Sequence, residues 1–185
     1  MKSLTVMKTT LVEWRKDPAL PLAFQLMGEE GMVASVTFPN PQDTLAVVET
    51  AEGRWTLKHL GLLNPVTTVR EEGATRNMAV FHPHALRHGK LQFTDGAVFD
   101  WAHLHDDEPG GAFLDIEGKP MVRIHYRTKD IATPGGPPNY GITELGQPPA
   151  ARWRHALLAA TGWYILLMDR YKEFPEHCAE KSLLI

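Results

Sequence analysis

The chain contains a single cysteine, Cys178, among its 185 residues, so it cannot form an intrachain disulfide. A reducing compartment, the cytoplasm, is therefore the expected location. Positive charge is also not in excess. The formal net charge is −3, which argues against general electrostatic binding of nucleic acid. The first residues contain neither an uninterrupted apolar segment nor a small-residue cleavage site, so we expect no signal peptide.

Motifs of common enzyme classes are missing as well. The chain has no G-x-S-x-G nucleophile elbow and no phosphate-binding G-x-x-x-x-G-K-[ST] loop. Cys178 follows His177, but both lie in a charged tail that does not resemble the surroundings of a catalytic thiol. These absences favour a protein that is not an enzyme, and we predict no catalytic residue and no cofactor.

Turn-forming residues, in contrast, are abundant. Fifteen glycines and fourteen prolines separate short apolar runs, with turn signals about every 8–12 residues, a spacing typical of an all-β sandwich or barrel. Asp95-Gly96 and Glu117-Gly118 are examples, each between two alternating segments. We predict one domain over residues 1–185, with strands roughly over 32–145. Whether the first thirty residues add a strand or a covering helix is left open.

One segment near the C-terminus is apolar on every side. Between Ala156 and Met168 only Thr161, Gly162 and the Tyr164 hydroxyl depart from a plainly apolar character. A bilayer span needs about 20 such residues, and charged residues flank this shorter run, so we expect no membrane-spanning segment. A tail anchor is the alternative.

An apolar helix without a polar face must be buried, and a single sheet face cannot cover all of its sides. The sequence therefore predicts a mainly β protein. We expect a closed or nearly closed antiparallel β-barrel around a buried hydrophobic C-terminal α-helix, which spans roughly 150–174.

The short strands with D-G or E-G turns, FTDGAVFDW and FLDIEGKPMVRIHY, followed by HALLAATGWYILLMDRY, resemble the tubby C-terminal-like superfold. This superfold includes the tubby domain, the LURP-one-related proteins and the phospholipid scramblases. The resemblance lies in the spacing over residues 32–174, and it implies a twelve-stranded barrel around a central C-terminal helix. The chain shows no phosphoinositide-binding basic cluster, cysteine-rich stretch or calcium-binding segment of these families. Their association with lipids therefore carries over as an analogy of fold only.

Two groups of cations are candidate ligand-binding residues. Arg123, His125 and Arg127 alternate along one strand, and Arg152 and Arg154 stand at the start of the helix. Arginine binds phosphate oxygens bidentately, and free backbone N–H groups at a helix N-terminus also bind anions. The alternatives are a solvated outer face for the first group and, for the second, long side chains that reach out to the barrel mouth. The leading hypothesis is a non-catalytic protein that binds an anionic lipid headgroup, a hydrophobic ligand or a protein partner.

Nine histidines are an unusual number, and they include two H-x-H patterns. His82 with His84, and His103 with His105, each place two imidazoles on one face of a strand, and Glu108 follows the second pair. The alternative hypothesis is a metal-dependent enzyme that uses both groups, and the competing interpretation is that all are solvated loop residues. A helix that fills the barrel leaves no room for an interior metal site, so the hypothesis of a metal site inside the barrel competes with that of a buried central helix.

Overall fold

The computed structural model describes residue 1 and residues 11–20, 22–40, 42–61, 63–84, 88–104, 109–127, 131, 137–146 and 154–173. Residues 171–173 are described by their backbone only. These residues form twelve strands and one helix. The strands are β1 (Leu11–Lys16), β2 (Ala23–Gly28), β3 (Gly31–Thr37), β4 (Ala46–Thr50), β5 (Gly53–Leu60), β6 (Val66–Glu71), β7 (Ala79–Pro83), β8 (Gly89–Phe93), β9 (Val98–His103), β10 (Gly110–Leu114), β11 (Pro120–His125) and β12 (Tyr140–Leu145), and the helix is α1 (Arg154–Glu173).

Each strand pairs antiparallel with its neighbours in the sequence, and β1 pairs with β12, which closes the barrel. The predicted fold class, an antiparallel barrel around a C-terminal helix, is therefore confirmed. β1 and β2 come from the segment that the sequence left open, so strands begin at Leu11, well before residue 32. β6 had not been identified from the sequence.

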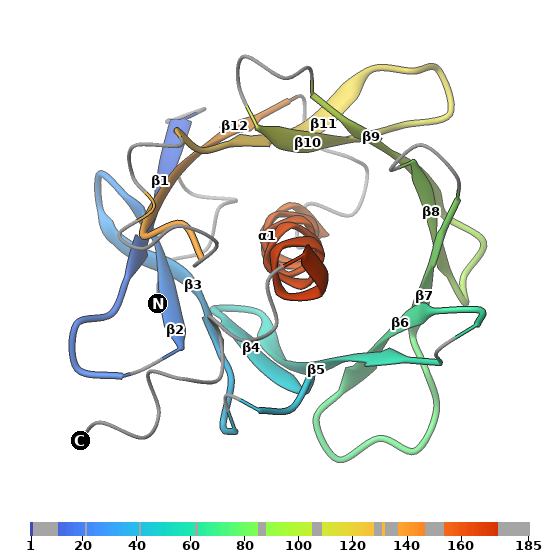
Figure 1. Cartoon of the computed structure of the whole chain (residues 1–185). Helices are drawn as coiled ribbons and strands as arrows, with labels where there is room; N and C mark the ends of the chain where they lie inside the picture. Colours follow the sequence, from blue (N-terminus) through green and yellow to red (C-terminus); the bar gives the residue numbers. More distant parts are fainter. Residues whose placement is uncertain are drawn as a thin grey trace.

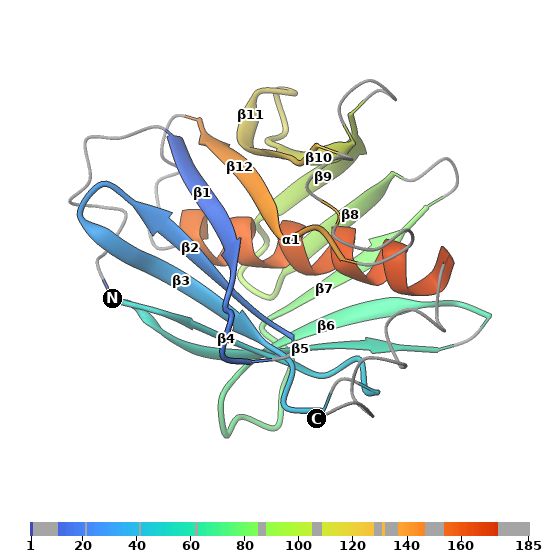
Figure 2. The same cartoon turned by 60° about the vertical axis from the view of Figure 1, so that its left-hand side comes forward.

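The helix α1 runs through the interior along the barrel axis, as Figures 1 and 2 show. We call the end where α1 begins the entry mouth. The connections after the even-numbered strands lie there, and they include the β8–β9 turn at Asp95-Gly96, where Gly96 has the positive φ of 90° that the sequence favours. The other end, the exit mouth, carries the connections that follow the odd-numbered strands.

Side chains fill the space between α1 and the strands. Every helix residue from Arg154 to Met168 is buried. Val122 and Ile124 of β11, with Tyr126 just after it, point inward and are buried, whereas Arg123 is exposed on the outer face. Each large apolar side chain that is fully buried contributes about 1.5–3 kcal/mol before the cost of conformational entropy, so α1 is a principal part of the core.

The helix packs closely against β10 and β11 on one side and against β3 and β4 on another. Two glycines make room for the large side chains between α1 and the strands. A methyl group at Gly162 of α1 would lie 2.6 Å from Ile124 Cδ1 and 3.0 Å from Trp101 Cζ3. A methyl group at Gly141 of β12 would lie 2.5 Å from Trp163 Cζ3. Trp163 stacks in turn on Trp14 of β1, with ring centroids 5.2 Å apart. Larger residues at either glycine would force the helix away from the strands.

Candidate binding surfaces

At the entry mouth, Arg154 is engaged inside the barrel. Its guanidinium pairs with the Asp95 carboxylate in the β8–β9 turn and lies 4.6 Å from the centroid of the Phe93 ring. The side chain is 9% exposed. The structure thus gives Arg154 a carboxylate partner in the position where the sequence predicted a bound anion, and the residue ties the start of α1 to the wall. Arg152 lies outside the described residues.

At the exit mouth, His103 also faces the helix. Its Nε2 lies 3.1 Å from Asp169 Oδ2 on α1, and its side chain is 16% exposed. Elsewhere on the same rim, His59 Nδ1 of β5 lies 3.3 Å from the hydroxyl of Thr67 on β6. Both imidazoles lie on the inner side of the rim. His103 connects β9 to α1, and His59 connects β5 to β6.

His82 and His84, the other H-x-H pair, lie at the end of β7 and are exposed on the outer face of the barrel. His82 and His84 therefore lie on the outside of the wall, whereas His103 points inward to Asp169. His105 and Glu108 lie outside the described residues. Within the part of the chain that the structure describes, no three His, Cys, Asp or Glu side chains lie close enough together, as placed, to hold a metal ion.

The outer face of β11, β12 and β1 brings together one of the predicted cation groups. The strand register places Arg123 opposite Glu144 and His125 opposite Ile142, and these two β12 residues lie opposite Leu11 and Glu13 of β1. We call this surface the β11–β12–β1 face. Its members are Leu11, Glu13, Arg15, Arg123, His125, Tyr140, Ile142 and Glu144, together with Arg127 just beyond β11.

On this face the cations lie beside carboxylates or an aromatic ring. Arg123 Nη1 is 3.7 Å from Glu144 Oε2, and both side chains are nearly half exposed. Arg127 is exposed, and its guanidinium lies 5.8 Å from the centroid of the Tyr140 ring. His125 is half-buried, and its Nδ1 is buried without a hydrogen-bond partner. The face carries mixed charge, and Arg154 lies apart from it at the entry mouth.

A shallow pocket of about 340 Å³ borders this face on the outside of β1 and β2. Its lining consists of Leu11, Glu13, Arg15, Met27, Gly28 and Glu29. None of these residues had been singled out from the sequence, because the alternation along β1 is that of any half-buried strand. A pocket formed between two adjacent strands leaves no motif in the sequence.

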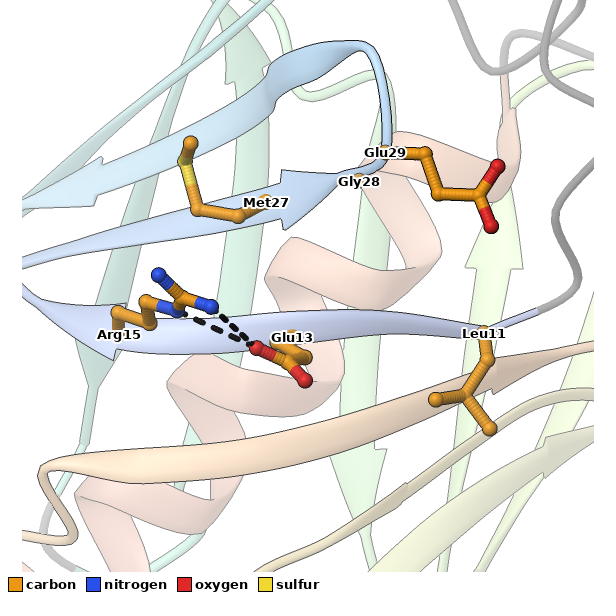
Figure 3. Close-up of a pocket in the computed structure, with 6 residues that line it drawn as sticks. All are labelled: Leu11, Glu13, Arg15, Met27, Gly28 and Glu29. Atoms are coloured by element: carbon orange, nitrogen blue, oxygen red, sulfur yellow. Dashed lines mark hydrogen bonds and ion pairs between the residues drawn. The ribbon is translucent and has the colours of Figure 1, made fainter.

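The electrostatic centre of the pocket is Glu13. Arg15 Nη2 donates to Glu13 Oε2 at 2.7 Å and Arg15 Nε donates to the same oxygen at 3.2 Å, as the two dashed lines in Figure 3 show. These hydrogen bonds lower the pKa of the Glu13 carboxyl, and a hydrogen bond from the Tyr140 hydroxyl lowers it further. Burial raises the pKa of Tyr140, and the same contact with Glu13 adds to that shift. Glu13 therefore stays ionised at neutral pH and holds Arg15 and Tyr140 in place.

No protein-family model, curated protein or solved structure matches this chain. Among the described residues, no helix combines the length and the apolar character needed to cross a membrane.

Proposed function

We propose that the chain is a non-catalytic binding protein that recognises its partner with the outside of the barrel. The observation that carries this proposal is the burial of every α1 side chain from Arg154 to Met168. The helix takes the volume in which other barrels hold a ligand, so a hydrophobic ligand inside the barrel would have to displace it. Binding is therefore assigned to the outer surface.

The β11–β12–β1 face is the proposed contact surface, and a protein is the proposed partner. Exposed Arg127 beside Tyr140 supplies the two residue types that most often dominate protein interfaces. Carboxylates stand beside the other arginines, Glu144 near Arg123 and Glu13 near Arg15. Such alternation complements a partner surface of mixed charge, whereas a strongly anionic bilayer would be repelled by the carboxylates.

An anionic lipid headgroup is the second candidate, favoured by the exposed guanidiniums of Arg123 and Arg127. The twelve-strand count and the central terminal helix support the resemblance to the tubby C-terminal-like superfold, which we propose as the fold family. The metal-dependent enzyme is the less supported proposal, because His82 and His84 lie outside the wall and His103 points inward.

Site-specific photo-crosslinking in extract tests the proposal. A photoreactive residue replaces Ile142 on the β11–β12–β1 face or, as the matched control, Val80 on the outer face of β7 across the barrel; both side chains are half-buried. We expect one discrete crosslinked protein from position 142 and none from position 80. The product should disappear with Arg127→Glu and persist with Arg76→Glu, an exposed arginine in the β6–β7 connection.

Flotation with vesicles separates the two candidates. Purified protein is mixed with neutral or anionic vesicles at low and at high salt, and the proposal predicts no flotation under any condition. Flotation with anionic vesicles alone, weakened by salt and abolished by Arg127→Glu, would assign the face to a lipid headgroup instead. Equal crosslinking from positions 142 and 80, or none from either, would remove the face from consideration.

A further inference from the structure

The β7–β8 hairpin places three histidines in a defined arrangement. Its register pairs His82 with Lys90 and Pro83 with Gly89. The His84 backbone N–H then donates to the carbonyl of His88 at 2.8 Å, which continues the same pairing by one more residue. His84 and His88 therefore lie directly opposite each other where β7 ends and β8 begins, and His82 precedes His84 by two residues on the same face.

The core fixes this register. Phe81 of β7 points inward and is buried, and a methyl group added at Gly89 would overlap its ring. Only a residue without a side chain fits opposite Pro83. A slip of either strand by one residue would turn its inward side chain, Phe81 on β7 or Leu91 on β8, to solvent, so the core holds His88 opposite His84.

All three imidazoles are accessible. His82, His84 and His88 are exposed, while their inward neighbours Phe81 and Gly89 are buried. Pro83 between the two β7 histidines has a fixed φ and stiffens the strand end. The nearest cation in the register, Lys90, lies 3.5 Å from Asp100 Oδ1 on β9, so its charge is partly balanced on the side away from His82.

We propose that His84 and His88 bind one late transition-metal ion, such as Zn²⁺ or Ni²⁺, on the outer face of this hairpin. Directly opposite residues of an antiparallel pair have Cβ atoms about 4.5–5.5 Å apart. Two imidazoles at that separation reach a common ion at the usual Zn–N distance of about 2.0–2.1 Å after rotation of their exposed side chains. Imidazole nitrogen is a preferred ligand of these metals, and water completes the coordination. The site is separate from the β11–β12–β1 face and from the inward-facing His103.

Isothermal titration of the tag-free chain with Zn²⁺ and with Ni²⁺ tests this site. All variants carry Cys178→Ser, so that the only thiol of the chain does not bind the metal. We expect one ion per chain, and at least about tenfold weaker binding in His84→Ala and in His88→Ala, because each removes one of the two opposed ligands. His125→Gln, a histidine on β11, is the matched control and should bind as the parent does.

A second readout locates the ion. Paramagnetic Ni²⁺ added in less than stoichiometric amount should broaden the NMR resonances of His84 and His88 before those of His59 and His103. Thermal unfolding of each variant without metal should match the parent, because the substituted side chains are exposed. The absence of saturable binding would overturn the proposal, and so would binding that survives the His84→Ala, His88→Ala double variant.

Discussion

The Tyr164 hydroxyl of α1 donates a hydrogen bond of 2.5 Å to the backbone carbonyl of Thr44, which precedes β4 at the exit mouth. The Tyr164 ring also stacks on Phe38, with centroids 5.8 Å apart. Burial raises the pKa of this phenol far above its ordinary value of about 10. The helix is thus attached to the β3–β4 connection by a group that cannot ionise while it remains folded.

The raised pKa of Tyr164 predicts alkaline lability. The folded state keeps the phenolic proton at pH values where the unfolded chain loses it, so this contribution to stability is complete below pH about 10 and declines as pH rises further. In a spectrophotometric titration Tyr164 should ionise only as the protein unfolds. Tyr164→Phe should lower the free energy of unfolding at pH 7 by about 1 kcal/mol and flatten its decline above pH 10. An unchanged slope in the variant would contradict the assignment.

Gly162→Ala should destabilise the protein although alanine favours helix by about 1 kcal/mol over glycine. The new methyl group would press on Ile124 Cδ1 and the Trp101 ring. We expect a net loss of about 1–3 kcal/mol in chemical denaturation. Ile124→Val removes the Cδ1 atom, so the double variant should lose less than the sum of the single losses. Strict additivity would show that Gly162 does not pack against this residue.

Thr161→Val should stabilise the chain. Thr161 is fully buried on α1, and its hydroxyl has no hydrogen-bond partner. A buried polar group without a partner costs about 1–3 kcal/mol, and valine fills nearly the same space. Thermal unfolding should show that the free energy of unfolding rises by about 1 kcal/mol. A loss in Thr161→Val would mean that the hydroxyl binds an internal water molecule.

Substitutions at Asp95 and at Arg154, which form an ion pair, should lower the free energy of unfolding by unequal amounts. Arg154 is almost completely buried, whereas Asp95 is more than half exposed. Asp95→Asn keeps the side-chain oxygen that accepts from the Ala97 N–H but leaves the buried guanidinium without its carboxylate. Since Asp95 is exposed to solvent, we expect a loss of about 1–2 kcal/mol. Arg154→Met removes the buried charge itself and should cost less; a larger loss in Arg154→Met would contradict this ordering.

The fold could be inferred because one segment constrained it strongly. Four consecutive apolar residues, Ile165 to Met168, left α1 no face for water, and only a closed sheet satisfies that requirement. The inward and outward sides of β11 also followed from its alternation at Val122 and Arg123. β6 was missed because Thr67 and Thr68 make its apolar alternation weak, although both side chains are buried, Thr67 on the inner face of the barrel and Thr68 on the outer face.

The candidate sites were less predictable, because they depend on contacts between residues distant in the sequence. Nothing near Arg154 indicates that a turn 59 residues earlier would supply Asp95. Glu13 and Tyr140 meet only because β1 closes the barrel against β12. The opposition of His84 and His88, in contrast, is local and depends only on the register of the β7–β8 hairpin.

Hydrogen exchange along α1 tests the central claim, that the helix is a permanent part of the core and that binding belongs to the outside. Peptides that cover Ala156–Met168 should be among the slowest to exchange, with opening free energies near that of global unfolding. Their protection should not change when anionic vesicles are added. Fast exchange of this segment, or protection that falls with vesicles while the strands stay protected, would show a helix that leaves the barrel and would contradict the account.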